Sequence, residues 1–170
     1  MSQLPCLTVE ERLEQLEADA ARQQAALAEV EARTAIRRLM ADYALGTDRR
    51  DAERFLAIWT EDAVYDLGEV FGTATGREAI QETLKGLWEW AADIHHWITD
   101  VTVTFTSPDS AYGDAHVISF VKHADGGAET LVACTYDNVY ERHGGEWLIA
   151  RCKLDVHWWK QLPFETLVQG

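Results

Sequence analysis

The sequence predicts an α+β fold in which a strongly curved mixed sheet is closed by about three helices into a cone-shaped barrel, preceded by an extra N-terminal helix. Helical periodicity dominates up to about residue 92, and alternation of apolar and polar residues dominates after it. Helices followed by hairpin-linked strands are typical of α+β domains. The expected strands reach about 12 residues, a length at which a sheet curves strongly. A curved sheet closed by helices forms a cone with a pocket inside.

The expected N-terminal helix carries a heptad seam about three heptads long. Pro5 and Thr8 mark its start, and Glu11 completes a capping-box pattern with Thr8. Residues 1–32 are therefore predicted to form an arm that either packs on its own domain or makes an intersubunit coiled coil in a homodimer or homotrimer. The seam has 4-3-4-3 spacing and comprises Val9, Leu13, Leu16, Ala20, the polar Gln23, Leu27 and Val30.

The cone domain is predicted to span residues 33–162, followed by a C-terminal tail at 163–170. Its first helix is expected to end near Gly46, because glycine commonly terminates helices. The turn signals SPDS, ADGG and HGG separate the last four strands, as in an antiparallel meander. The expected helices are the segment from 34 to about 46, a short segment with Phe55, Leu56 and Trp59, and 76–92; the expected strands are about 63–67, 98–106, 111–123, 129–142 and 146–159.

The composition narrows the classes of partner. The chain has 170 residues, which fits a single globular domain, and a formal net charge of −14. Such a surface repels phosphate backbones and anionic lipid head groups, so neither nucleic acid nor a membrane is an expected partner. The sequence has no apolar stretch of the roughly 18–20 residues needed to span a bilayer, and its start lacks a signal-peptide pattern. A cytoplasmic location is expected.

Cysteine and histidine spacing gives no indication of a metal or cofactor. Cys6, Cys134 and Cys152 form no CxxC pair, which argues against a disulfide framework and a structural zinc site. Cys134 and Cys152 lie in apolar strand-like runs and are expected to pack in the core. The chain also lacks the glycine-rich loops that cradle phosphates. The remaining histidines, His116, His123, His143 and His157, are scattered without HxH or HExxH spacing.

Two adjacent histidines, His95 and His96, mark the expected change from helix to strand. Neighbouring side chains of a strand point to opposite faces, so only one of the two can face a given pocket. An imidazole can act as a general base near neutral pH when a carboxylate fixes its tautomer and stabilises its cation. Asp48, in the segment GTDRRD, is a candidate for that carboxylate, although a loop or ion-pair role is also consistent with its position.

The segments RTAIRRLMADYALGTDRRDAERFLAIWTEDAVY, IHHWITDVTVTF and TYDNVYERHGGEWLIARCKL together resemble the SnoaL-like branch of the nuclear transport factor 2-like superfamily. The resemblance covers about residues 33–159 and leaves out the heptad helix. It is most specific at Asp48 and His96, which match the catalytic Asp–His dyad of the dehydrochlorinases and dehydratases in this branch. The resemblance therefore implies that His96 is the base and that Asp48 orients it.

Two further positions carry implications of the same resemblance. Tyr43 matches a tyrosine of a dehydratase and would polarise a carbonyl or assist a leaving hydroxyl. Cys152 stands where the dehydrochlorinase has a pocket arginine, so a cation that would assist halide departure is missing.

Alternation along the strands predicts a mostly apolar and aromatic pocket wall, which suits a cyclic, neutral or weakly polar small molecule. The expected lining residues are Tyr65, Leu87, Val117, Ser119, Val132, Cys134, Tyr136, Cys152, Leu154, Val156 and Trp158.

The sequence thus predicts a cofactor-independent lyase that carries out a dehydratase-type elimination, with a double-bond isomerase or cyclase as the alternative enzyme. A cone domain can also serve as a non-catalytic binding or assembly module, with the heptad helix as its working part.

Overall fold

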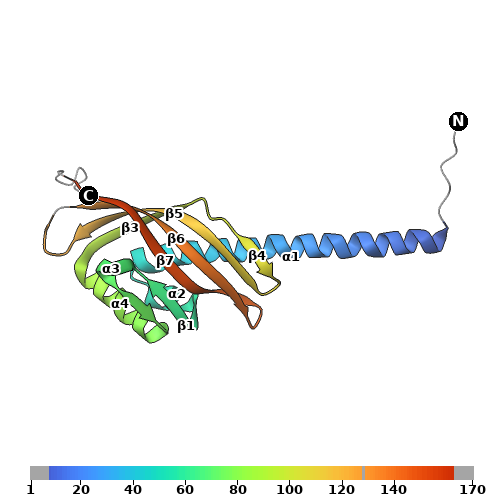
Figure 1. Cartoon of the computed structure of the whole chain (residues 1–170), viewed down its shortest axis with the longest axis horizontal. Helices are drawn as coiled ribbons and strands as arrows, with labels where there is room; N and C mark the ends of the chain where they lie inside the picture. Colours follow the sequence, from blue (N-terminus) through green and yellow to red (C-terminus); the bar gives the residue numbers. More distant parts are fainter. Residues whose placement is uncertain (1–7, 128, 163–170) are drawn as a thin grey trace. The chain divides into compact units, whose positions relative to one another are not determined.

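The structure, a computed structural model, describes residues 8–127 and 129–162 (Figure 1). The chain divides into two compact units after Thr34. Pro5, Cys6 and the predicted tail at 163–170 lie outside the described residues. None of the helices in the described ranges is both long and apolar enough to cross a membrane.

Helix α1 (Val9–Asp48) is one continuous helix of 40 residues that joins the two units. Its start has the predicted capping box. The Thr8 hydroxyl accepts the Glu11 N–H at 3.2 Å, and the Glu11 carboxylate accepts the Thr8 N–H at 2.7 Å. The helix ends at Asp48, two residues after the Gly46 near which its end was expected.

Gly46 has a packing role instead of a terminating one. A Cβ atom at this position would lie 2.8 Å from the backbone nitrogen of Phe55, at the centre of helix α2 (Ala52–Ala57). The glycine therefore allows the two helix backbones to approach closely. This contact also sets the position of the last turn of α1, and so of Asp48.

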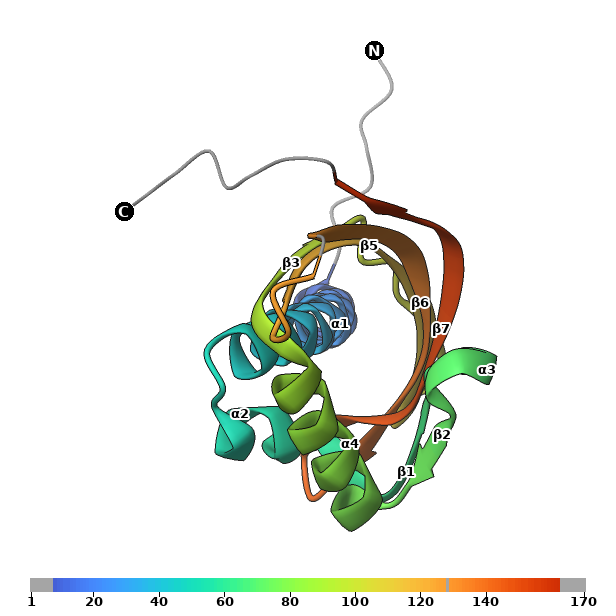
Figure 2. The ribbon, with the colours of Figure 1, turned by 90° about the vertical axis from the view of Figure 1, so that its left-hand side faces the viewer.

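After α2 the elements are β1 (Trp59–Asp66), α3 (Gly68–Phe71), β2 (Thr73–Thr75), α4 (Arg77–Trp90), β3 (Ala91–Thr99), β4 (Thr104–Ser107), β5 (Ser110–His123), β6 (Thr130–His143) and β7 (Glu146–Gln161). The sheet has seven strands in the order β2-β1-β7-β6-β5-β3, with β4 paired to β5, and is mixed as predicted. Strands β1 and β7 are parallel, and the other neighbours are antiparallel. Figure 2 shows the sheet curving strongly, with α2 and α4 along its open side.

Three boundaries differ from the sequence prediction. The strand expected at 98–106 is two strands, because Asp100 has a φ of 51° and interrupts the extended backbone. Strand β3 begins at Ala91, directly after α4, so His95 and His96 lie within a strand and not at its corner. Trp59, expected in a helix, begins β1.

Candidate active site

Asp48 and His96, which are far apart in the sequence, are in direct contact. Oδ1 of Asp48 lies 2.6 Å from Nδ1 of the His96 ring, and Oδ2 accepts the backbone N–H of His96 at 3.0 Å. The His96 side chain is 5% exposed and that of Asp48 is 12% exposed. One carboxylate at the end of α1 thus holds both the ring and the backbone of a residue in β3.

This geometry fixes the tautomer of His96. An ionised carboxylate only accepts hydrogen bonds, so the proton of the neutral ring is assigned to Nδ1 and Nε2 keeps its lone pair. Within the described residues, no side chain or backbone group forms a hydrogen bond with Nε2. The edge of the Tyr43 ring packs on the imidazole, with the ring centroids 5.7 Å apart at 85°. The free nitrogen is therefore available as a general base.

His95 lies on the other side of the strand. Its side chain is 58% exposed, and its Nδ1 is 3.9 Å from Asp48, too far for a hydrogen bond. Its ring packs on Trp97, which is 55% exposed. The alternation of β3 therefore places His96 on the concave face and His95 on the outer face.

Two hydrogen bonds hold the end of α1 against α4 and β3. The Arg50 guanidinium donates to the carbonyl oxygen of Ala91 at 2.8 Å, and the Trp88 indole N–H donates to that of Thr47 at 2.9 Å. Arg50 has a φ of 55°, which turns the chain sharply after the helix. These contacts keep Asp48 next to His96. The sequence pattern predicted neither of these two hydrogen bonds. The position of Arg50 in the GTDRRD turn after a helix was the only signal for the first, and no sequence signal marks the second.

Three tyrosine hydroxyls meet beside this pair. The hydroxyl of Tyr43 lies 2.5 Å from that of Tyr65 and 3.2 Å from that of Tyr136. Burial raises the pKa of each phenol well above its ordinary value, so all three remain protonated at neutral pH. Two contacts use two of the three hydroxyl protons, which leaves one proton for donation to a ligand.

The register of the sheet places the predicted lining residues relative to His96. His96 pairs with Ser119, Ser119 with Val132, and Val132 with Trp159, so one row of side chains crosses four strands. The next row on the same face contains Val117, Cys134 and Val156, and the following one contains Tyr136 and Leu154. Cys152 is fully buried beside Tyr65 on β1.

The two cysteines of this face are protonated. Burial raises the pKa of Cys134 to about 12, with the nearby Asp155 carboxylate adding to the shift. Burial likewise raises the pKa of Cys152 far above its usual range. Both side chains are therefore apolar surface and not nucleophiles at neutral pH.

The predicted inward position of Trp158 is wrong. A β-bulge leaves His157 without a pairing partner, so Cys134 pairs with Val156 but Ala133 pairs with Trp158. From the bulge onward the two faces are exchanged, and Trp159 takes the place expected for Trp158. Leu87 packs on a small cluster of Ala91, Ile94 and Val121.

A recess of about 700 Å³ opens at the end of the sheet next to the His96 row. Its lining includes Trp159 from that row and Thr130, whose strand neighbour Val121 belongs to the next row. His123 lies 3.0 Å from the Thr130 hydroxyl, and its ring meets the Trp90 ring edge-on at 4.5 Å. The recess thus adjoins the predicted pocket wall without sharing its residues. The complete lining is Phe71, Trp90, His123, Thr130, Trp159, Lys160 and Gln161.

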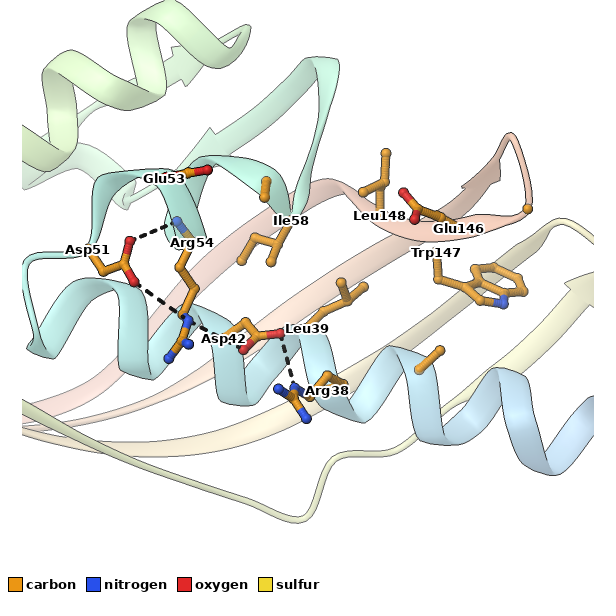
Figure 3. Close-up of a pocket in the computed structure, with 13 residues that line it drawn as sticks. Arg38, Leu39, Asp42, Asp51, Glu53, Arg54, Ile58, Glu146, Trp147 and Leu148 are labelled. Atoms are coloured by element: carbon orange, nitrogen blue, oxygen red, sulfur yellow. Dashed lines mark hydrogen bonds and ion pairs between the residues drawn. The ribbon is translucent and has the colours of Figure 1, made fainter.

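A second groove of about 700 Å³ lies away from these residues, between α1, α2 and the start of β7 (Figure 3). Four of its charged side chains, those of Arg38, Asp42, Asp51 and Arg54, form ion pairs with one another. Arg54 lies 3.8 Å from Asp42 and 3.7 Å from Asp51, and Arg38 lies 3.2 Å from Asp42. None of the predicted site residues lines this groove.

In the described ranges, no three histidine, cysteine or acidic side chains gather as metal ligands would.

The SnoaL-like domain family matches residues 28–153, which is most of the chain and includes the Asp48–His96 contact. The chain belongs to the SnoaL-like domain family. Hexachlorocyclohexane dehydrochlorinase 1 of Sphingobium indicum is 31% identical to this SnoaL-like chain over 120 residues, which cover 70% of the chain and 77% of the relative. The gamma-hexachlorocyclohexane dehydrochlorinase of the same species is 28% identical over 120 residues, covering 70% and 76%.

Solved structures agree with this assignment. A type 2 hexachlorocyclohexane dehydrochlorinase LinA has a TM-score of 0.80 and 27% identity to the SnoaL-like chain, covering 85% of it and 99% of the LinA chain. A LinA of type 3 from Novosphingobium barchaimii has a TM-score of 0.78 at 27% identity, with the same coverage. The SnoaL-like chain is thus homologous to lyases, and its fold is the cone expected from the sequence. The heptad residues before residue 28 lie outside the family match.

Proposed function

We propose that this chain is a cofactor-independent lyase that eliminates water from a cyclic, largely apolar small molecule. The observation that carries the proposal is the contact of 2.6 Å between Asp48 Oδ1 and His96 Nδ1. It leaves one imidazole nitrogen free as a base on the concave face, next to a cluster of neutral hydroxyl donors.

His96 would start the elimination. Nε2 takes a proton from a carbon adjacent to the one that bears the leaving group, and the ring becomes an imidazolium. The Asp48 carboxylate at Nδ1 stabilises that cation in a site where water has little access. The electron pair of the C–H bond becomes the second bond of the alkene. Asp48 acts as a positioning residue, because it reaches the substrate only through His96.

The tyrosine cluster would assist departure of the hydroxyl. Tyr43 contacts both other phenols, so its donated hydrogen bond to the substrate oxygen is supported by the neighbouring hydroxyls. As the C–O bond breaks, the leaving hydroxide takes a proton from this cluster and departs as water. The cluster then regains its proton from the imidazolium, and the enzyme returns to its starting state.

Water is favoured as the leaving group because of the residue at position 152. The resemblance implies that dehydrochlorinases have an arginine at the corresponding position, whereas this chain has a buried, protonated cysteine. A neutral hydroxyl donor matches a leaving hydroxyl, which needs a proton, better than it matches a chloride, which needs a positive charge. The recess lined by Phe71, Trp90 and Trp159 adds aromatic surface suited to a ring-bearing substrate.

The test incubates the full chain with a panel of cyclic hydroxy ketones and follows the products by mass spectrometry. Loss of one water from a panel member, abolished in His96→Ala and retained in the matched variant His95→Ala, supports the proposal. Product of unchanged mass with a shifted double bond assigns the alternative isomerase activity. Tight binding without any product, equal in the two variants, assigns a binding module and contradicts the lyase.

A further inference from the structure

The heptad seam of α1 is exposed to solvent along the whole N-terminal unit. Its aliphatic side chains are between 56% and 86% exposed. Helices in proteins owe most of their stability to packing of an apolar face. This helix therefore gains little stability while its apolar stripe stays exposed. The exposed seam residues are Val9, Leu13, Leu16, Leu27 and Val30.

The seam is not a continuation of the stripe that packs in the cone domain. Extended at heptad spacing past residue 30, it would pass through Thr34, Arg37 and Ala41, all of which are exposed. In the second unit, the large apolar side chains of α1 that are buried are instead those of Ile36, Leu39, Met40 and Tyr43. The apolar pattern therefore moves to another side of α1 where the two units meet, so the first unit presents a face of its own.

We propose that residues 9–30 pair in parallel and in register with the same segment of a second copy of this chain. The seam supplies the a positions Leu13, Ala20 and Leu27 and the d positions Val9, Leu16, Gln23 and Val30. Knobs of this spacing pack into the holes of an identical helix. The proposal is independent of the enzymatic function, because residues 9–27 lie outside the match to the SnoaL-like family.

The charges beside the seam select the parallel orientation. The e positions are Glu10, Glu17, Gln24 and Glu31, three of them acidic, and a fully overlapped antiparallel pair would bring Glu10 of one chain beside Glu31 of the other. In a parallel pair, the g position Arg12 of one chain meets Glu17 of the other, and the reciprocal pair forms by symmetry. Within the described part of the chain, no ion pair occupies Arg12 or Glu17.

Gln23 specifies the register. In a parallel, in-register pair it lies directly across from its counterpart, where the two amides can hydrogen-bond to each other. A shift by one heptad would place Gln23 against Leu16 or Val30 and bury an unpaired amide. A polar residue at one seam position thus lowers the stability of the pair but excludes the shifted pairings.

Disulfide trapping in the full chain tests this arrangement. Cys6→Ser removes the natural cysteine at residue 6, which precedes the seam in the sequence and could cross-link by itself. Cys134 and Cys152 are buried and stay in place. In this background Gln23→Cys places a thiol in the seam, and Ala25→Cys places one at the outer f position as the matched control. Under mild oxidation, the seam thiol is expected to form cross-linked dimers about tenfold faster than the control thiol, because only the seam thiols are held together.

A second pair of variants shows whether the seam itself holds the chains. Leu16→Asn with Leu27→Asn in the Gln23→Cys chain is expected to lower the linking rate to that of Ala25→Cys. The matched change Ala18→Asn with Ala25→Asn on the outer face should leave the rate unchanged. Equal rates for the two thiols, or an unchanged rate after the seam substitutions, would overturn the proposal. An arm that packs on its own domain, or an antiparallel pair, gives no preference for the Gln23→Cys thiol.

Discussion

The hydroxyl oxygens of Tyr43 and Tyr65 lie 2.5 Å apart, and Tyr136 completes the cluster from a third element of the fold. These phenols come from α1, β1 and β6, so the cluster is a product of the tertiary structure alone. Because Tyr43 also packs on the His96 ring, the imidazole and the three neutral hydroxyls lie in one site.

The cluster predicts a loss of stability at alkaline pH. Burial raises the pKa of Tyr43 above the ordinary value of 10.0, so above about pH 10 the unfolded chain loses the phenol proton while the folded chain keeps it. The folded state then binds more protons than the unfolded state, and the free energy of unfolding falls as the pH rises. Urea unfolding at about pH 8 and about pH 11 measures this slope. The variant Tyr43→Phe should have a shallower slope than wild type, whereas Tyr112→Phe, at a residue that is 52% exposed, should match wild type.

Loss of the carboxylate should remove turnover without unfolding the protein. Asp48→Asn keeps the shape of the side chain, but its amide can donate to Nδ1 and so favours the wrong tautomer of His96. We expect the rate of elimination to fall by about 10³-fold or more, by analogy with other carboxylate–histidine pairs. Steady-state kinetics on a substrate found in the screen gives the rate, and thermal unfolding verifies the fold. Activity within about tenfold of wild type would contradict the assigned role of Asp48.

The two adjacent tryptophans of β7 offer a matched test of the recess. Trp159 lines it, whereas Trp158 pairs with Ala133 on the outer face. Trp159→Ala should weaken binding of a neutral ring ligand such as 2-naphthol by about tenfold, because it removes an aromatic wall. Trp158→Ala should leave the affinity unchanged. Fluorescence titration measures both, and equal effects would remove the recess from the substrate path.

A charge reversal distinguishes the two orientations of the arm. Glu17→Lys opposes Arg12 of the partner copy in a parallel pair, so self-association should weaken, by about 0.5 kcal/mol or more per pair. In an antiparallel pair with the arms fully overlapped, Glu17 lies beside the neutral Gln24 of the other copy, so the same change should leave self-association unchanged. Sedimentation equilibrium of the full chain measures the direction. The double variant Arg12→Glu with Glu17→Lys should restore the wild-type association.

Two helical glycines should respond to alanine in opposite directions. At Gly46 a Cβ atom would collide with the Phe55 backbone, so Gly46→Ala should destabilise the fold by about 1–3 kcal/mol. At Gly86, in α4, a Cβ atom meets nothing within 4 Å, so Gly86→Ala should stabilise it by about 0.5–1 kcal/mol. Chemical unfolding of both variants measures the difference. A neutral Gly46→Ala would show that α1 and α2 can separate without loss of stability.

Much of the fold could be predicted from residue patterns, because periodicity and capping are local. The Thr8–Glu11 capping box, the hairpin-linked strands and the opposite faces of His95 and His96 all follow from rules that operate over a few residues. The family resemblance also pointed to the Asp48–His96 contact, which spacing alone could not, since the two residues meet only through the folded chain. The predicted role of Gly46 as a helix terminator was wrong, because a close contact between two helices requires a glycine just as a helix end does, and the sequence does not tell the two apart.

The remaining errors have a common physical origin in single irregular residues. Asp100, with its positive φ, divides one expected strand into two; aspartate is rare in strands and tolerates positive φ, but the alternation on both sides of it hides the break. The extra residue at His157 reverses the faces of the strand end, and nothing in the alternation of VHWWK marks which residue is unpaired. Arg50 and Trp88 act through backbone carbonyls, which carry no sequence signature.

The bulge at His157 has a consequence for how this site can change over time. Removing His157 would restore the simple alternation with Trp158 still paired to Ala133 and Trp159 still paired to Val132, so both side chains would keep their faces. A deletion of one codon at the bulge would thus remove the irregularity without changing the lining of the recess. The end of β7 can therefore become a regular strand while Trp159 stays in the recess and Asp48 and His96, on other elements, stay in place.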